Sequence, residues 1–351
     1  MSMAGSLQQF DVHSRASAGS PDALWRAVAQ SCGGMLTDWG VKILRKGLDN
    51  HLGTVVAETG YLCKDHRNLY SHYYSKKFHP GSPECIRLHF FSRDAVTPTT
   101  FRSGPGTLQS DYLGFSVIRP VSGRCLGRSV FSAERVGLSH YNLATDFKVH
   151  LRGQVLTVRG FPYTSQDTDV TVCAHAALWA TCRYLSERYP VYREVYPYDL
   201  VEWTAPHRGR RAPHRGMTYE DYSTILTSFG AHPEVLRIQE EEGKQSLEKF
   251  QDMCSYIESG FPVLASLKGH VIVAIGHTLD FSALHHPLYG TAAADPLGMV
   301  DCSAYWKQII VVDDNAFPHA QLGFAEDPAN YLRPVSYTHL DVYKRQPQTQ
   351  A

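Results

Sequence analysis

The sequence predicts an α+β protein with two parts, an N-terminal α+β domain over residues 21–159 and a second α+β domain over residues 160–334. Three observations lead to this prediction. The chain has 351 residues, which is enough for two hydrophobic cores of ordinary size. The first 160 residues combine one clear helical pattern with several strand-like runs. After residue 160, helical patterns come first and apolar, strand-like runs follow, an order typical of α+β domains.

The first part opens with residues 1–20, which we expect to be a disordered N-terminus. A helix is predicted directly afterwards, because Ser20, Pro21 and Asp22 have the form of an N-terminal cap before an amphipathic run. Residues 61–78 are dense in Tyr, His and Lys, and we interpret them as a partly buried aromatic cluster, with a partner surface as the alternative. Strands rich in β-branched and aromatic residues are expected at residues 85–91, 112–121 and 147–158.

The second part contains three predicted helices and three predicted strands. The first helix is apolar and begins at Cys173. The second follows a capping box from Thr218 to Asp221 and ends at Gly230. The third helix is expected at residues 247–257. The three strands are expected at residues 261–267, 270–277 and 308–312. The basic stretch at 207–216 is interpreted as a solvated loop, with substrate or phosphate contact as the alternative.

Composition excludes several classes of function. The 34 basic and 34 acidic residues give a formal net charge of zero, so nonspecific nucleic-acid binding is not expected as the main role. The N-terminus lacks the apolar segment of a signal peptide, and no apolar run approaches the ~20 residues of a membrane span. The 8 cysteines include no CxxC pair and are widely scattered, which indicates that most of them are buried thiols in a reduced compartment. We therefore expect a cytoplasmic protein without nucleic-acid or membrane partners.

The C-terminal residues 335–351 differ from the rest of the chain. Residues 335–346, VSYTHLDVYKRQ, resemble the translation of two inverted transposase-adapter ends joined head to head. We expect this tail to be adapter-derived and without a role in the fold. A genuine polar tail is the alternative.

Cys173 is the candidate nucleophile. It follows a polar, turn-prone stretch and starts a helix, where unpaired N–H groups and the positive end of the helix dipole favour a thiolate. The same N–H groups can stabilise an oxyanion, and the side-chain amide of Gln166 could supply a second donor. Cys182 lies nine residues further along the same helix and is interpreted as a core residue.

His270 is the candidate base, because it opens a nearly apolar strand where a polar imidazole needs a hydrogen-bond partner. His277 lies seven residues later, so strand alternation predicts that the two rings point to opposite faces and do not share one site. An acidic or amide residue at the end of the next strand could orient the imidazole. Three consecutive residues are candidates for that role, Asp313, Asp314 and Asn315.

The order of these residues resembles the papain-like cysteine peptidase superfamily, and most closely its bacteriocin-leader (double-glycine) peptidase branch and bacterial relatives. The match runs from Gln166 and Cys173 to His270 with Gly276 and then Asp313, over residues 160–320. It implies a papain-like fold at 160–334, and a peptidase reaction on a peptide or protein substrate with no metal or other cofactor. The family's Asp-Cys-Gly is Val-Cys-Ala here, which leaves the substrate class open. Its Asp-Pro is Asp-Asp-Asn, which leaves the orienting residue open.

Other readings remain. The same triad would serve transglutaminase-like transfer or cell-wall amide hydrolysis, because a fold does not decide the substrate. A non-catalytic binding module of the same fold is a third possibility. Cys173 with His175, or the pair His285 and His286, could be metal ligands, but none of these spacings matches a common zinc motif.

Overall fold

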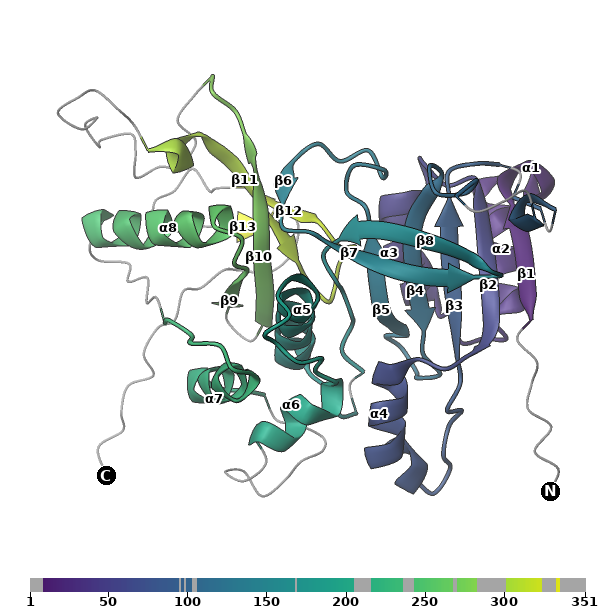
Figure 1. Cartoon of the computed structure of the whole chain (residues 1–351), viewed down its shortest axis with the longest axis horizontal. Helices are drawn as coiled ribbons and strands as arrows, with labels where there is room; N and C mark the ends of the chain where they lie inside the picture. The colour runs from purple at the N-terminus through teal and green to yellow at the C-terminus, as the bar shows by residue number, and fades with distance from the viewer. Residues whose placement is uncertain are drawn as a thin grey trace. The chain divides into compact units, whose positions relative to one another are not determined.

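The computed structural model describes residues 9–334 apart from residues 95, 98, 103–105, 168, 205–215, 236–242, 268–269, 283–300 and 324–332. The protein is of mixed α+β class (Figure 1). It divides into two compact units, each assembled from separated stretches of chain. The first unit comprises Met1–Leu138, Ala144–His232 and Asp314–Pro318, and the second comprises Ser139–Leu143, Pro233–Asp313 and His319–Ala351. The units therefore do not divide at residue 160, and the helix of Cys173 belongs with the N-terminal sheet.

The first unit contains a five-stranded antiparallel sheet in the order β1-β2-β3-β4-β5, a separate hairpin β7-β8, and seven helices among its described residues. Its strands are β1 (Phe10–Ser14), β2 (Thr54–Tyr61), β3 (Cys85–Phe91), β4 (Tyr112–Ile118), β5 (Leu126–Phe131), β7 (Thr145–Leu151) and β8 (Gln154–Gly160). Its helices are α1 (Arg15–Ala18), α2 (Pro21–Ser31), α3 (Asp38–Leu48), α4 (Lys64–His72), α5 (Cys173–Arg188), α6 (Pro197–Thr204) and α7 (Tyr219–Phe229), with 3-10 turns η1 (Tyr74–Lys76) and η2 (Thr100–Arg102).

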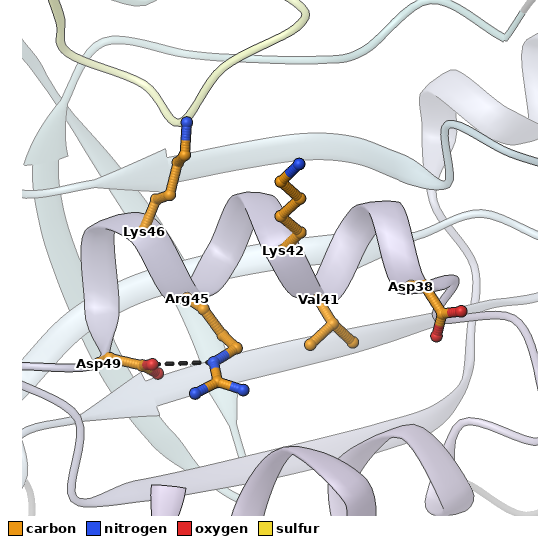
Figure 2. A pocket seen from close by; sticks show the side chains of 6 residues that line it. All are labelled: Asp38, Val41, Lys42, Arg45, Lys46 and Asp49. Atoms are coloured by element: carbon orange, nitrogen blue, oxygen red, sulfur yellow. Dashed lines mark hydrogen bonds and ion pairs between the residues drawn. The ribbon is translucent and has the colours of Figure 1, made fainter. Parts of the chain in front are cut away.

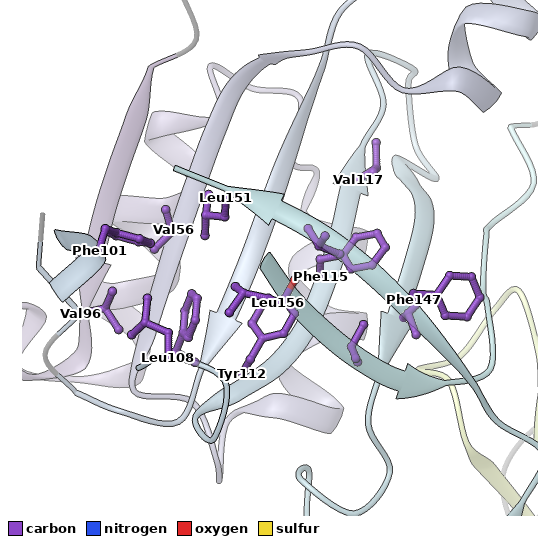
Figure 3. Packing of buried hydrophobic residues seen from close by; sticks show 14 of the residues in the cluster. Val56, Val96, Phe101, Leu108, Tyr112, Phe115, Val117, Phe147, Leu151 and Leu156 are labelled. Carbon is purple, nitrogen blue, oxygen red and sulfur yellow. The ribbon is translucent and has the colours of Figure 1, made fainter. Parts of the chain in front are cut away.

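The sheet of the first unit is covered on both faces, which explains why β3 and β4 are buried along their whole length. The hairpin β7-β8 lies across one face, and its inward residues join those of β2, β3 and β4 in one apolar cluster (Figure 3). On the other face, the ring of Trp25 from α2 lies 6.3 Å from that of Phe90 on β3. The strands β7 and β8 alternate buried and more exposed residues, as expected of strands with one free face.

Two expectations for this unit need correction. Residues 10–18 are not disordered, because β1 pairs in register with β2, and Phe10 and Val12 pack on the core. The single strand expected at 147–158 is a hairpin. Arg152 and Gly153 take positive φ values of 47° and 81°, which turn the chain between β7 and β8. The local sequence does not predict this turn, because its first residue is Arg, where Asn, Asp or Gly is usual.

The second unit is built around a sheet in the order β13-β12-β11-β10-β6, with β9 also paired to β10. Its strands are β6 (Tyr141–Asn142), β9 (Val263–Leu267), β10 (His270–Leu279), β11 (Trp306–Val312), β12 (Ala320–Gly323) and β13 (Arg333–Pro334). The helix α8 (Gly243–Glu258) packs its apolar face on β10 and β11, and the turn η5 (Cys302–Tyr305) leads into β11. The expected helix and three strands of this region are all present.

Four of the regions discussed above lie partly or wholly outside the described residues. They are most of the basic stretch 207–216, the pair His285 and His286, the N-terminal residues 1–8 and the tail 335–351.

Candidate functional site

Cys173 is the first residue of α5, as the sequence predicts. Its side chain is partly exposed, whereas the helix is buried from Ala174 to Leu185. The helix start is closed by one of its own residues, because Nδ1 of His175 accepts a hydrogen bond of 3.2 Å from the backbone N–H of Val172. A thiol at the first position of a helix lies at the positive end of the helix dipole, which favours the thiolate.

A buried ionic contact holds α5 against the N-terminal sheet. Asp65 of α4 accepts a 2.7 Å bond from Arg128 of β5 and a 3.3 Å bond from the indole N–H of Trp179 on α5. All three side chains are buried or nearly so. Because an unpaired buried charge is costly, this arrangement fixes the relative positions of α4, β5 and α5. Two elements of the first unit that precede residue 160, α4 and β5, thus support the Cys173 helix.

Glu194 adds a second anchor near the end of α5. It accepts bonds from Arg183 of α5, Lys64 of α4 and the Tyr196 hydroxyl, the last two at 3.1 Å. Partial burial opposes ionisation of Glu194, but Arg183, Lys64 and Arg128 together hold its pKa at about 2. The carboxylate therefore stays charged and paired across the physiological pH range.

The segment before Cys173, residues 165–172, is organised by Asp167. Its buried carboxylate accepts bonds at Oδ1 from the backbone N–H groups of Asp169, Val170 and Thr171, at 3.1, 2.8 and 2.8 Å. Gln166 precedes it and is partly exposed, with its backbone carbonyl bonded to Arg119 at 3.3 Å. Among the described residues, the side-chain amide of Gln166 has no hydrogen-bond partner. It is thus available as an oxyanion donor.

His270 and Asp313 are brought together in the second unit. His270 opens β10, Asp313 follows β11, and the antiparallel register pairs Val273 with Val312. The result is a 2.8 Å contact between Nε2 of His270 and Oδ1 of Asp313, with 13% and 23% of the two side chains exposed. If Nε2 carries the proton donated to Asp313, Nδ1 holds the lone pair and is the basic nitrogen.

The other two candidate orienters, Asp314 and Asn315, make different contacts. Asp314 belongs to the first unit, is buried, and pairs with Arg124 at 2.8 Å. Its backbone carbonyl accepts a 3.1 Å bond from the hydroxyl of Tyr163. The side-chain amide of Asn315 contacts the carboxylate of Asp314 at 3.5 Å. Asp313 is therefore the candidate for which a direct bond to His270 is described.

His277 and His270 make separate contacts, as expected. Strand alternation, which predicts that the two rings point to opposite faces, is not the reason. A bulge between Ala274 and Gly276 shifts the register of β10, so the two histidines are not related by simple alternation. The ring of His277 stacks on Trp306 at 4.0 Å and bonds to Glu258 of α8 at 2.5 Å. Seven residues of strand, at about 3.3 Å each, separate it from His270.

The remaining cysteines fall into two groups. Six are buried, and burial raises the pKa of Cys32 to about 12 and that of Cys63 to about 11. Cys302 is exposed, and the six buried thiols confirm the expectation that most of the cysteines are buried. It begins the short turn η5 directly after the capping residue Asp301, so its side chain is not covered by the sheet. Its pKa is raised, first by partial burial and then by the carboxylates of Asp301 and Glu258.

A shallow, open hollow lies elsewhere on the first unit, over α3 (Figure 2). Its central residue is Arg45, which pairs with Asp22 at 2.6 Å and Asp49 at 2.8 Å. Its charge is thus already balanced by two carboxylates. The lining contains none of the predicted site residues and consists of Asp38, Val41, Lys42, Arg45, Lys46 and Asp49.

The structure bears on one of the two predicted alternatives for metal binding. The ring of His175 closes the start of α5 through Nδ1, so it is used in holding the helix. His285 and His286 lie outside the described residues.

Comparisons with protein-family models, curated proteins and solved structures gave no match for this chain. In the described part of the chain, no helix combines the length and the apolar character needed to cross a membrane.

Sequence reasoning missed three residues of the site's surroundings, Asp167, Arg119 and Tyr74. Asp167 could have been found, because an Asp in a polar turn often accepts bonds from the N–H groups that follow it. Arg119 and Tyr74 gave no such signal, since their partners lie 46 and 93 residues away in sequence.

Proposed function

We propose that this protein is a cysteine-dependent peptidase of papain-like type. Cys173 is the nucleophile, His270 the base and Asp313 the residue that orients His270. The contact that carries the proposal is the 2.8 Å bond between His270 and Asp313, which joins two strand ends 43 residues apart. A partly exposed thiol at the start of a buried helix supports the choice of nucleophile.

In the proposed reaction, Nδ1 of His270 takes the proton of the Cys173 thiol, and the thiolate attacks the carbonyl carbon of a peptide bond. The oxyanion that forms accepts hydrogen bonds from the Gln166 amide and the backbone N–H of Cys173. The imidazolium returns its proton to the leaving amine as the C–N bond breaks, which leaves a thioester. Water then attacks the thioester, gives a proton to Nδ1, and releases the acid and the free thiol.

Asp313 has an indirect part in this scheme. Its carboxylate holds the ring of His270 in one orientation and one tautomer, and it stabilises the imidazolium. Because it transfers no proton itself, we expect its loss to slow the reaction without changing the products.

The experiment is incubation of the full chain with a peptide library, followed by mass spectrometry. The wild-type protein should cleave peptide bonds, and Cys173→Ala should abolish the cleavage. Cys302→Ala is the matched control, because Cys302 is the other accessible thiol among the described residues, and it should leave cleavage unchanged. Cleavage that survives in Cys173→Ala contradicts the proposal. Incorporation of an added amine, without hydrolysis, would assign the triad to transglutaminase-like transfer instead.

A further inference from the structure

The segment between Gln166 and Cys173 is held from two sides by buried, oppositely charged side chains. On one side is Asp167, only 2% exposed, which binds three successive backbone N–H groups. The backbone N–H of Asp167 itself donates a 3.0 Å bond to the hydroxyl of Thr171. These bonds join Asp167 to the backbone of residues 169–171 just before the helix.

Arg119 binds the other end of the same segment. This side chain is 4% exposed and follows the end of β4. Its Nη2 donates to the carbonyl oxygens of Ser165 at 2.8 Å and Gln166 at 3.3 Å, and to the Ser165 hydroxyl at 3.0 Å. It also reaches the carbonyls of Arg124 and Leu126, at 3.0 and 3.2 Å. A single guanidinium therefore joins the β4-β5 turn to the residues around Gln166.

Tyr74 links this segment to a region with no assigned role. It lies in η1 after α4, within the Tyr- and His-rich stretch, and its hydroxyl donates a 2.9 Å bond to Oδ2 of Asp167. Burial and the nearby Asp167 carboxylate raise the pKa of Tyr74, so the phenol remains a donor. Lys77, three residues on, pairs with Asp169 at 2.5 Å. The aromatic side chains of the stretch are partly buried, with Tyr74 in an apolar cluster that Tyr70 and Tyr73 pack against, and the stretch also contacts the residues that precede Cys173.

We propose that Asp167 and Arg119, supported by Tyr74, are positioning residues that align the Gln166 amide with Cys173 for acyl transfer. The inference rests on the proposed function. Gln166 and Cys173 are seven residues apart on an irregular segment, so their alignment depends on what holds that segment. Arg119 fixes the backbone at Gln166, Asp167 fixes the turn that leads to Cys173, and both are too buried to contact a substrate.

The test compares two reactions of Cys173 in the full chain. Acylation by p-nitrophenyl acetate forms the S–C bond, breaks the ester C–O bond and releases p-nitrophenolate, and it passes through an oxyanion. Alkylation by iodoacetamide displaces iodide and forms no oxyanion. A residue that aligns the oxyanion donor should affect the first reaction and not the second.

Tyr74→Phe removes one bond to Asp167 and is the mildest variant. It should slow acylation about ten-fold, as small displacements of catalytic groups do, while alkylation of Cys173 stays within about two-fold of wild type. Asp167→Asn and Arg119→Lys should show the same selectivity. Tyr112→Phe is the matched control, because its buried hydroxyl bonds to His89 and not to this segment, and it should change neither rate.

A double-mutant cycle tests whether Tyr74 affects acylation through Gln166. Gln166→Ala alone should slow acylation by about 10²-fold. If Tyr74 acts through Gln166, adding Tyr74→Phe to Gln166→Ala should cause little further loss. An unchanged ten-fold effect in that background overturns the inference, and so does an equal loss of acylation and alkylation in Tyr74→Phe. If neither reagent selects Cys173 in the wild-type protein, the proposed function itself fails, which is a distinct result.

Discussion

Cys173 and His270 are presented by two different kinds of structure. The segment before Cys173 has no regular structure, and it is shaped by buried side chains from distant parts of the first unit, above all Asp167 and Arg119. His270 instead stands at the start of a strand whose position follows from the backbone pairing of β10 with β9 and β11. In the first case side chains hold the backbone, and in the second the backbone places the side chains.

The difference has consequences for how each region responds to mutation. Where backbone pairing sets the geometry, one side chain can be removed without moving its neighbours. Where one carboxylate satisfies three backbone N–H groups, its removal leaves several buried polar groups without partners. The first unit should therefore be sensitive to single polar substitutions, and the second to changes that disturb strand contact.

The largest expected effect is the loss of Asp167. Asp167→Ala should lower the free energy of unfolding by about 3 kcal/mol, because the N–H groups of Asp169, Val170 and Thr171 lose a charged acceptor. Asp313→Ala should cost about 1 kcal/mol, since its contact with His270 is partly exposed and the strands remain paired. Urea unfolding of the full chain measures both. Equal costs for the two variants would remove the distinction between the regions.

A second test uses pH. His89 is completely buried, its Nδ1 accepts from Tyr112 at 3.0 Å, and its Nε2 contacts Glu58 at 3.3 Å. Burial lowers the pKa of His89 to about 4, although the bond to Glu58 opposes the shift. An unfolded His titrates near ~6.5, so between pH 6.5 and pH 4 the unfolded state binds more protons and stability falls as the pH falls.

His89→Gln should flatten this pH dependence. The substitution should remove about 3 kcal/mol of the pH-dependent change in the free energy of unfolding. This figure follows from a difference of about 2.5 pKa units between the unfolded and folded states, at about 1.36 kcal/mol per unit. Urea unfolding between pH 7 and pH 4 provides the measurement, and His79→Gln, at an exposed position, is the control. A wild-type protein equally stable at pH 7 and pH 4.5 would be inconsistent with a buried neutral His89.

A third test, with a smaller expected effect than those of Asp167 and His89, concerns strand contact in the second unit. Gly276 of β10 faces β6, and a Cβ there would lie 2.0 Å from the backbone oxygen of Tyr141. Gly276→Ala should therefore cost about 2 kcal/mol, the usual result of overpacking against backbone. Gly81→Ala is the control, because its nearest neighbour would be 3.6 Å away. A neutral Gly276→Ala would show that β6 moves freely away from β10.

The sequence predicted the parts of the site that depend on local pattern. The start of α5 at Cys173, the strand that opens with His270 and the acidic residues after β11 are marked by periodicity, caps and strand ends. The local sequence also predicted the capping box at Thr218 and the end of α7 at Gly230, which takes the left-handed backbone conformation.

What could not be predicted depends on long-range contact or on irregular backbone. The bond from Tyr74 to Asp167 spans 93 residues, and nothing in either local sequence indicates the other. The bulge in β10 invalidates an alternation argument for His277 that would hold in a regular strand. The N-terminal part could be predicted as α+β, but not as the support of the Cys173 helix, which depends on Asp65, Arg128 and Trp179 meeting in space.

The central claim is that Cys173 and His270 work as a pair, and the most direct measurement is competitive labelling at pH 6 with limiting iodoacetamide and peptide mapping. Cys173 should be labelled ahead of Cys302, the exposed competitor whose pKa is raised by its surroundings. His270→Ala should slow labelling of Cys173 at least about ten-fold, because it removes the partner that stabilises the thiolate. His277→Ala is the control and should leave the labelling rate unchanged, because His277 is bonded to Glu258. Labelling of Cys173 no faster than Cys302, or equal effects of the two His variants, would contradict the account.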